Sequence, residues 1–294
     1  MTEPALTAPV QELAYAKLNL VLHVGNPRED GLHPLCSIFA SIDLFDDVHL
    51  ERADHDSVEC PGVDGANLAE AALAALRRRV PHLPPLRITI DKRIPIAAGL
   101  GGGSADAAAV LRGANHIAGD PLTGEELVEL AAQLGSDVPS QVDPRHELVS
   151  GVGEIVEPIE LPPFGAVLVS QAEGLAAAAV YAQFDLLGGG RNGLDPQILR
   201  ELGEDMELAP VLGNDLQPAA LALRPELEGV LTSLQDAGAL GALVSGSGPT
   251  CFGLFPDRAA AVTAAATIDG ALAAGLRSPV TDGDSAGDTP TAAP

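Results

Sequence analysis

The stretch that most constrains this chain is PIAAGLGGGSADAAAVL, residues 95–111, in which four glycines precede an Ala-rich run. Glycine permits positive φ and lets the backbone come close to a ligand. The free N–H groups at a helix N-terminus, together with the helix dipole, favour an anion, so the pattern predicts a phosphate site. We expect Ser104 to cap a helix that starts at Ala105. A flexible linker is the alternative, but the loop follows a β-branched strand, Arg87–Asp91.

Two familiar nucleotide loops do not fit this stretch. A Walker loop has Lys and then Ser or Thr directly after its last Gly, whereas Ser104 and Ala105 follow here. Gly99-Leu100-Gly101 begins the dinucleotide pattern, but no clear βαβ unit follows. The run Pro-x-x-x-Gly-Leu-Gly-Gly-Gly-Ser-Ala instead resembles the second motif of the superfamily that contains galactokinase, homoserine kinase, mevalonate kinase and phosphomevalonate kinase. In that superfamily the loop wraps the ATP phosphates and its Ser lies near Mg²⁺.

Composition excludes several classes of protein. With 294 residues the chain is long enough for one large domain or two smaller ones. The net charge of −25 argues against nucleic acid as a partner. No apolar run is long enough to cross a membrane and no secretory signal is visible, which predicts a cytoplasmic protein. Cys36, Cys60 and Cys251 form no CxxC pair and are expected to be free thiols, and the seven histidines show no metal-ligand spacing.

Hydrophobic periodicity predicts alternating strands and helices. Strands are expected in Glu12–Val24, Val48–Glu51 (after Asp46-Asp47), Leu86–Asp91, Val152–Ile159, Ala166–Ser170, Ala239–Val244 and Thr250–Phe255. Helices are expected from Asn67, from Ala105 to Ile117, after the Thr123–Glu126 capping box, and over Ala176–Leu187, Leu194–Leu202, Leu216–Leu223, Pro225–Ala237 and Arg258–Ala274. A composition shift near Leu161 predicts domains at 1–160 and 161–278. Residues 1–11 are expected to be a loose leader and 279–294 a disordered tail.

The segment AYAKLNLVLHV, with GLHPL behind it, resembles the opening motif of the 4-diphosphocytidyl-2-C-methyl-D-erythritol kinases, a family of the same superfamily. The Lys of this motif is catalytic in the family, which implies that role for Lys17, and Asn19 would line the substrate pocket. Lys17 and Lys92 are the only lysines in the chain, beside fourteen arginines. An ammonium beside an acceptor hydroxyl stabilises a developing alkoxide and keeps a neighbouring carboxylate ionised. The alternative for Lys17 is a solvated side chain on a half-exposed strand.

The segment LGSDVPS, residues 134–140, resembles the run that carries the catalytic Asp of this family. A helix that ends at Gly135 leaves Asp137 at a sharp break before Pro139, from which a carboxylate can project into a cleft. The resemblance implies that Asp137 is the general base that takes the proton of the acceptor alcohol. An N-cap or turn Asp is the alternative.

The resemblance extends from about Ala14 to Phe255 and includes LVSGSGPTCFGLF, which we expect to form a supporting wall of the site. There are two departures from the family. The usual Gly-Tyr-His is here Gly31-Leu32-His33, so one ring expected to stack on cytosine is aliphatic, and a base stack contributes roughly 1–3 kcal/mol. The segment SQVDPRHELVSG replaces an apolar, double-Gly stretch behind Asp137. Both changes are expected to alter substrate affinity more than reaction type.

The resemblance implies an α+β, two-domain GHMP-kinase-like fold with the active site in the interdomain cleft. It implies ATP and Mg²⁺, with Ser104 near the metal, and a small-molecule cytidine diphosphate substrate bound by a monomer or homodimer. The catalytic residues would be Lys17 and Asp137, and the substrate residues Asn19, Leu32, His33 and Tyr181. The ATP residues would be Asn67 with Pro95, Ile96, Ala97, Ala98, Gly99, Leu100, Gly101, Gly102, Gly103, Ser104 and Ala105.

The expected reaction is ATP-dependent phosphorylation of the 2-hydroxyl of 4-diphosphocytidyl-2-C-methyl-D-erythritol, in the non-mevalonate isoprenoid pathway. Three alternatives stay open from the sequence. One is another small-molecule kinase of the superfamily, of the homoserine or mevalonate type. The second is a catalytically weak nucleotide-binding homologue, and the third is a Rossmann oxidoreductase.

Overall fold

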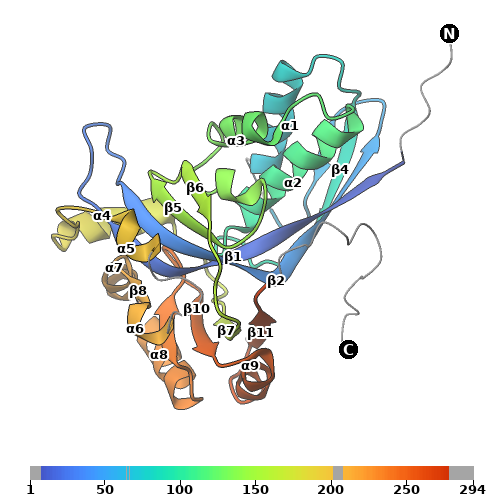
Figure 1. Cartoon of the computed structure of the whole chain (residues 1–294). Helices are drawn as coiled ribbons and strands as arrows, with labels where there is room; N and C mark the ends of the chain where they lie inside the picture. The colour runs from blue at the N-terminus through green and yellow to red at the C-terminus, as the bar shows by residue number, and fades with distance from the viewer. Residues whose placement is uncertain (1–7, 64, 66, 201–207, 278–294) are drawn as a thin grey trace, which may run out of the picture.

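Two β-sheets lie at the centre of the molecule and helices cover their outer faces (Figure 1). The computed structural model describes residues 8–63, 65, 67–200 and 208–277. Over these residues the larger sheet consists of β1 (Val10–Val24), β2 (Leu35–Arg52), β3 (Ser57–Glu59), β4 (Leu86–Asp91), β5 (Glu147–Gly151), β6 (Ile155–Pro158) and β8 (Gly213–Asn214). The smaller sheet consists of β7 (Gly165–Val169), β9 (Gly241–Val244), β10 (Cys251–Phe255) and β11 (Ala271–Gly275).

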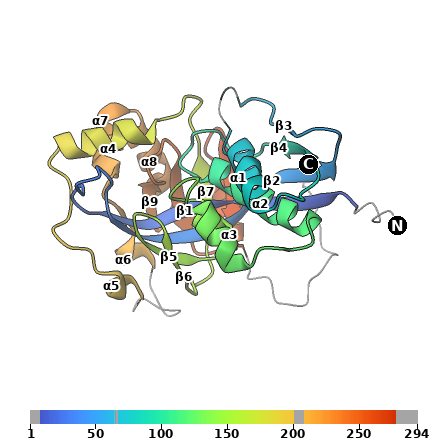
Figure 2. The same cartoon turned by 90° about the horizontal axis from the view of Figure 1, so that it is seen from above.

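The helices divide between the two sheets (Figure 2). In the described residues they are α1 (Leu68–Arg79), α2 (Gly102–Ile117), α3 (Gly124–Ala131), the 3₁₀ turn η1 (Pro139–Gln141), α4 (Ala177–Leu186), α5 (Pro196–Arg200), α6 (Leu208–Val211), α7 (Gln217–Leu223), α8 (Leu227–Asp236) and α9 (Arg258–Ala265). Helices α1, α2 and α3 lie over one face of the larger sheet, whereas α8 and α9 pack on the smaller one. The architecture confirms the α+β class.

The larger sheet runs in the order β3-β4-β2-β1-β8, with β5 and β6 attached to β2. Strand β1 is antiparallel to β2, and its register shifts between Tyr15 and Lys17. Such a shift turns the following side chains to the opposite face of a sheet. Ala14 accordingly packs under α1 and α2, whereas Leu18 packs between the two sheets. The shift therefore directs Lys17 toward the helix-covered face.

Three apolar cores hold these layers together. The first lies between the larger sheet and α1 to α3, and the second lies between the two sheets. The third packs β7 and β10 against α4, α7, α8 and α9. Each fully buried Leu, Ile or Phe side chain contributes about 1.5–3 kcal/mol relative to exposure. Layers joined in this way form a rigid frame for the loops between them.

Several expected elements have different bounds. Strand β2 is continuous through Asp46-Asp47, because both residues pair with β1 and Asp47 also pairs with β4. The Asp46 carboxylate accepts hydrogen bonds from the backbone N–H groups of Arg93 and Ile94. The strand expected over Val152–Ile159 is a turn followed by β6, and β5 before it was not predicted. Cys36 and Cys251 are free and buried, whereas the free Cys60 is half-buried.

The helix expected over Arg258–Ala274 is wrong beyond Ala265. The helix has its C-cap at Ala266, and the turn that follows closes at Gly270, which has a φ of +68°. The following residues, Ala271–Gly275, form β11 because they pair with the buried strand β7. The expected tail, 279–294, and residues 1–7 of the expected leader lie outside the described residues. The leader expected over residues 1–11 is wrong at Val10 and Gln11, which begin β1 because they pair with Leu50 and His49 of β2. The boundary expected near residue 161 stays a prediction.

One buried carboxyl makes the stability of this fold depend on pH. Glu147 opens β5 opposite Phe39 and is 4% exposed. Burial raises the pKa of the Glu147 carboxyl to about 9, although Arg145 acts in the opposite direction. Because the pKa is higher in the folded than in the unfolded protein, the protonated form of Glu147 favours the folded state. This contribution to stability is complete below the unfolded-state pKa of about 4.5 and is lost as the pH rises toward 9.

We therefore expect Glu147→Gln to match the wild type in unfolding free energy near pH 4 and to exceed it near pH 8. Each unit of pKa difference corresponds to about 1.4 kcal/mol, so the gain at pH 8 is on the order of a few kcal/mol. Urea unfolding at the two pH values measures it. The same change in unfolding free energy at both pH values would contradict the assignment.

Candidate active site

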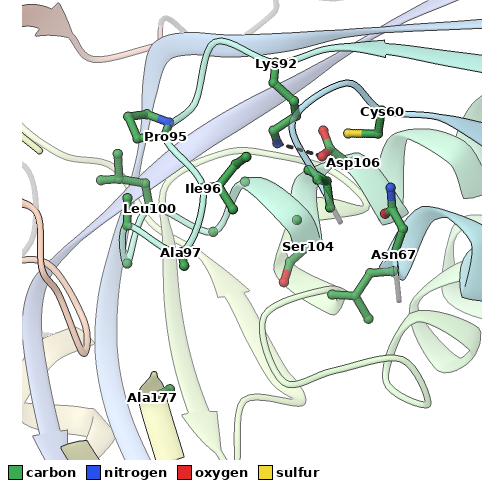
Figure 3. A pocket seen from close by; sticks show the side chains of 17 residues that line it. Cys60, Asn67, Lys92, Pro95, Ile96, Ala97, Leu100, Ser104, Asp106 and Ala177 are labelled. Atoms are coloured by element: carbon green, nitrogen blue, oxygen red, sulfur yellow. Dashed lines mark hydrogen bonds and ion pairs between the residues drawn. The ribbon is translucent and has the colours of Figure 1, made fainter. Parts of the chain in front are cut away.

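A cavity of about 480 Å³ lies along the Gly-rich loop and the start of α2 (Figure 3). Of the predicted ATP residues, Asn67 and the whole run 95–104 line this cavity. Ala105 does not line the cavity, because its side chain lies on the buried face of α2, in the first apolar core. Residues that were not predicted also line it, namely Cys60, Val63, Leu68, Lys92, Asp106 and Ala177.

Helix α2 begins earlier than expected, so the prediction that Ser104 caps it is wrong. The N-cap is Gly101, which has a φ of +74° and makes no side-chain cap hydrogen bond. The first intrahelical hydrogen bond runs from the N–H of Ala105 to the carbonyl of Gly101. The N–H groups of Gly102, Gly103 and Ser104 precede that bond and lie along the cavity. A first turn without a side-chain cap is suited to bind phosphate oxygens.

A second Gly-rich turn, Ser245–Pro249, packs against the first, and its expected role as a wall of the site stays a prediction. The Ser245 hydroxyl donates a hydrogen bond of 3.0 Å to the carbonyl of Gly99, and the Thr250 N–H donates one of 3.2 Å to the carbonyl of Ala98. The Asn214 side-chain amide donates to the carbonyls of Val244 and Gly246 and holds this turn in place. The two glycine turns therefore form one rigid unit.

We expect Gly99→Ala to disrupt that unit. Gly99 has a φ of +77°, and a Cβ at this position would lie 2.3 Å from the carbonyl oxygen of Ser245. The backbone of one turn must move, at a cost on the order of 1–3 kcal/mol. We predict a KM for ATP raised about tenfold or more, measured by initial rates. Gly124→Ala, at an exposed helix start with open space around it, is the matched control and should behave as the wild type.

Lys17 and Asp137, which are far apart in the sequence, meet beside the Gly-rich loop. The Lys17 ammonium lies 3.3 Å from Oδ2 of Asp137 and donates a hydrogen bond of 2.6 Å to Oδ1 of Asn19. It also lies 4.4 Å from the centre of the Phe39 ring. The Lys17 side chain is 5% exposed and that of Asp137 is 30% exposed. A buried ammonium thus holds a carboxylate that stays open to a ligand.

Backbone contacts fix Lys17 against the loop. Its N–H donates a hydrogen bond of 3.0 Å to the carbonyl of Leu100. A Cβ on Gly101 would lie 3.0 Å from Cγ of Lys17, so only glycine lets the loop come this close to the lysine stem. The Asn19 amide in turn donates to the Ser37 hydroxyl at 3.0 Å, which orients the Asn19 oxygen toward Lys17.

The unusual segment after Pro139 holds Asp137 in place. The Ser140 hydroxyl donates a hydrogen bond of 2.9 Å to the Asp137 carbonyl. The Arg112 guanidinium, on α2, donates one of 2.7 Å to the carbonyl of Gln141. These contacts tie η1 to α2, whose first turn lines the cavity. The altered segment therefore keeps the carboxylate beside the lysine.

The role of Lys92 was not predicted beyond the rarity of lysine in this chain. Its ammonium lies 2.5 Å from an oxygen of Asp46 and 2.7 Å from Oδ2 of Asp106. Burial raises the pKa of the Asp106 carboxyl, whose Oδ1 has no hydrogen-bond partner among the described residues. A Cβ on Gly102 would lie 3.3 Å from the Lys92 ammonium. The trio thus anchors the start of α2, and Figure 3 shows the contact between Lys92 and Asp106.

The predicted substrate residues lie in two places. Asn19 is beside Lys17, and His33 lies against Tyr181 with ring centres 5.1 Å apart. Burial raises the pKa of Tyr181 to about 12, and the negative charge of Asp137 adds to it, so this aromatic cluster lies within electrostatic reach of Asp137. Leu32 is 52% exposed.

Comparisons with known proteins agree with this geometry. Models of the N-terminal and C-terminal domains of the GHMP kinases match residues 67–143 and 196–272. A homoserine kinase from Cytophaga hutchinsonii shares the fold with a TM-score of 0.62 at 18% identity, over 94% of this chain and 97% of that one. The fold and the glycine-lined cavity therefore define a GHMP kinase.

Sequence relatives narrow the class further. The 4-diphosphocytidyl-2-C-methyl-D-erythritol kinase of Nocardia farcinica is 42% identical over 90% of this chain and 91% of its own length. The one of Streptomyces avermitilis is 40% identical over 82% and 86%. A crystal structure of a 4-(cytidine 5'-diphospho)-2C-methyl-D-erythritol kinase superposes with a TM-score of 0.77 at 34% identity, covering 91% of this chain and 99% of that one.

The chain belongs to the family of the 4-diphosphocytidyl-2-C-methyl-D-erythritol kinases. It is an enzyme, a kinase that acts on a small molecule and uses ATP as co-substrate. No helix within the described ranges has the length and apolarity needed to span a bilayer.

Proposed function

We propose that Lys17 and Asp137 catalyse the transfer of the γ-phosphoryl group of ATP to the 2-hydroxyl of 4-diphosphocytidyl-2-C-methyl-D-erythritol, a step of the non-mevalonate isoprenoid pathway. The observation that carries this proposal is the contact of 3.3 Å between the two side chains, directly beside the phosphate-binding turn. The family membership supplies the acceptor. Phosphoryl transfer depends on positioning and charge stabilisation, which this arrangement offers.

Each group has a distinct part in the reaction. The Asp137 carboxylate accepts the proton of the acceptor hydroxyl while the new O–P bond forms and the bond to the ADP oxygen breaks. The Lys17 ammonium holds that carboxylate in place and stabilises negative charge on the attacking oxygen. The backbone N–H groups of Gly102 and Gly103 bind phosphate oxygens without adding positively charged side chains.

The side chains near the expected ATP phosphates also determine how Mg²⁺ could be held. Mg²⁺ is usually held by one or two protein oxygens together with substrate phosphates and water. Ser104 offers a hydroxyl on the cavity, while Asp106 is tied to Lys92 and Asp137 to Lys17. This donor set fits an ion that arrives with the nucleotide and is held by the phosphates and Ser104. When bound, Mg²⁺ would neutralise phosphate charge.

On the acceptor side, we assign the cytosine ring to Tyr181 and its polar edge to the neighbourhood of His33. A base stacked on one aromatic ring gains roughly 1–3 kcal/mol. Leu32 would offer only aliphatic contact, so we expect weaker affinity for the base than two rings would give. Asn19, fixed by Ser37 and Lys17, lies where the methylerythritol part must approach Asp137.

The remaining features of the enzyme belong to the same proposal. A cytoplasmic protein that acts as a monomer or homodimer, without nucleic acid, accords with the charge of −25. We place the boundary between the two domains near residue 161. It would separate the N-terminal part, with the phosphate turn, from the part that carries Tyr181.

An ATP-consumption assay tests the function. The purified protein is given the cytidyl acceptor, mevalonate or homoserine in parallel, with ATP and Mg²⁺. We expect phosphorylation of the cytidyl acceptor only. Turnover of mevalonate or homoserine in its place would reassign the acceptor, and ATP binding without transfer to any of the three would indicate an inactive homologue.

A further inference from the structure

A chain of hydrogen bonds runs from the backbone of β1 to Lys17 and Asp137. The Ser37 hydroxyl, on β2, donates a hydrogen bond of 2.5 Å to the carbonyl of Val21. The Asn19 amide donates one of 3.0 Å to the Ser37 hydroxyl, and Lys17 donates one of 2.6 Å to Oδ1 of Asn19. The Lys17 ammonium is in turn paired with Asp137. Because Ser37, Asn19 and Lys17 are all buried, neighbouring protein groups rather than bulk water must satisfy their polar atoms.

An irregularity in β1 gives the Ser37 hydroxyl its acceptor. The register of β1 against β2 shifts between Asn19 and Val21, so that β1 has one residue more than its partner at this point. Such a bulge interrupts the ladder of backbone hydrogen bonds and re-aims nearby side chains. The Val21 carbonyl, beside the bulge, accepts from the Ser37 side chain. The single proton of the hydroxyl is thereby committed to the backbone, and only the lone pairs of its oxygen face Asn19.

The donors and acceptors leave one orientation for the Asn19 amide. An ammonium has three N–H donors and no acceptor, whereas a hydroxyl has one proton. With the Asn19 oxygen toward Lys17 and its NH2 toward Ser37, both contacts join a donor to an acceptor. The reverse orientation would set the NH2 against the ammonium, and the oxygen against a hydroxyl whose proton is already donated to Val21. Ser37 therefore determines which end of Asn19 faces Lys17.

The position of the Lys17 ammonium depends on that oxygen. The contact with Asp137 is longer, at 3.3 Å, and the Asp137 side chain is partly exposed, so the shorter hydrogen bond to Asn19 fixes the ammonium more firmly. The Phe39 ring, 4.4 Å away, attracts the positive charge but sets no hydrogen-bond direction. An Asn19 amide that is free to rotate would present its NH2 group, which repels the ammonium.

We propose that Ser37 is a positioning residue of the phosphoryl transfer: by fixing the Asn19 amide, it keeps the Lys17 ammonium beside Asp137 and the attacking oxygen. The proposal rests on the proposed function, because it takes Lys17 and Asp137 as the place of transfer. Ser37 acts through Asn19 rather than on the substrate. A misplacement on the order of 1 Å can cost about 10²-fold in rate, so loss of the hydroxyl should lower kcat by about 10–10²-fold.

Two variants of equal shape isolate the hydroxyl. Ser37→Thr keeps it and Ser37→Val lacks it, while both add the same bulk to a buried position. Ser37→Ala removes the hydroxyl without adding bulk. Ser150→Ala is the matched control, because Ser150 is a buried serine on β5, the strand that pairs with β2 beside Ser37. The kcat and the KM for ATP are measured at saturating acceptor, and circular dichroism shows whether each variant is folded.

We expect Ser37→Ala and Ser37→Val to lower kcat by about 10–10²-fold while the KM for ATP stays within a few-fold. Ser37→Thr should stay within a few-fold of the wild type in kcat, and Ser150→Ala should match the wild type. Equal kcat values for the Thr and Val variants would overturn the proposal. Should Ser37→Ala fold poorly, Ser37→Cys replaces it, because a thiol is a weak acceptor for the Asn19 amide and kcat should fall in the same way.

A double variant shows whether Ser37 acts through Asn19. If it does, Ser37→Ala causes no further loss of kcat in the Asn19→Ala background, since residues in one hydrogen-bond network are not additive. Losses that multiply would contradict the proposal. If the wild type phosphorylates no acceptor, the proposed function fails, and urea unfolding of the wild type, the two single variants and the double variant decides the role of Ser37 instead. Non-additive unfolding free energies would support its hold on Asn19, and additive ones would exclude it.

Discussion

Asp137→Asn is expected to lower kcat by about 10²–10⁴-fold, the range typical of a lost general base, while ATP binding is kept. The amide has the shape of the carboxylate but cannot take up the proton of the acceptor hydroxyl. The hydrogen bond from Ser140 goes to the Asp137 backbone carbonyl and is kept, and the side-chain oxygen of Asn can still accept the hydrogen bond from the Ser136 hydroxyl. Steady-state rates at saturating acceptor give kcat, and nucleotide titration gives the affinity for ATP.

A neighbouring carboxylate supplies the control for this experiment. Asp143 lies in the same segment, is paired with Arg145 and is 65% exposed, so Asp143→Asn removes a charge near the site without touching Lys17. It should retain wild-type turnover. If Asp137→Asn also retained turnover within a few-fold, Asp137 would be a turn residue and another base would have to be sought.

The sequence predicts the ATP side of the active site (the donor half) better than the side where the acceptor binds (the acceptor half). The donor half depends on local signals: glycines at positions with positive φ, followed directly by a helix. Such signals lie within a few residues of one another and can be read without knowledge of the fold. Ser104 was predicted to be the N-cap of α2 because Ser is a common capping residue. The helix instead begins three residues earlier, with Gly101 as its N-cap.

The acceptor half depends on contacts between distant segments. Lys17 and Asp137 are 120 positions apart in the chain, and only the family resemblance connected them before the structure did. The register shift after Tyr15, which turns Lys17 toward the helices, leaves no clear mark on the alternation of apolar residues.

Burial explains why the cluster of Lys92, Asp46 and Asp106 was not predicted. Asp46 and Asp106 are charged residues that a hydropathy pattern places at the surface, yet both are almost fully buried around Lys92. A buried charge is tolerated when it is paired, and pairing cannot be read from one strand at a time. The rarity of lysine was the one sign that Lys92 has a special position.

Lys17→Met is expected to lower kcat by about 10²–10³-fold, the loss typical when one group that stabilises a developing oxyanion is removed. Met preserves the length and apolar volume of the side chain, so the packing against Gly101 and Phe39 is retained. The change leaves Asp137 and Asn19 without their shared partner. Circular dichroism and thermal melting show whether the variant is folded, and initial rates give kcat.

The double variant Lys17→Met/Asp137→Asn decides whether the two residues act as a unit. Groups that share one step are strongly non-additive, so the double variant should be at most a few-fold slower than the slower single variant. Losses that multiply would instead mean that Lys17 and Asp137 act independently, contrary to their contact of 3.3 Å. Lys17→Arg should not restore the rate, because the planar guanidinium is larger than the ammonium in a space closed by Gly101 and the Phe39 ring.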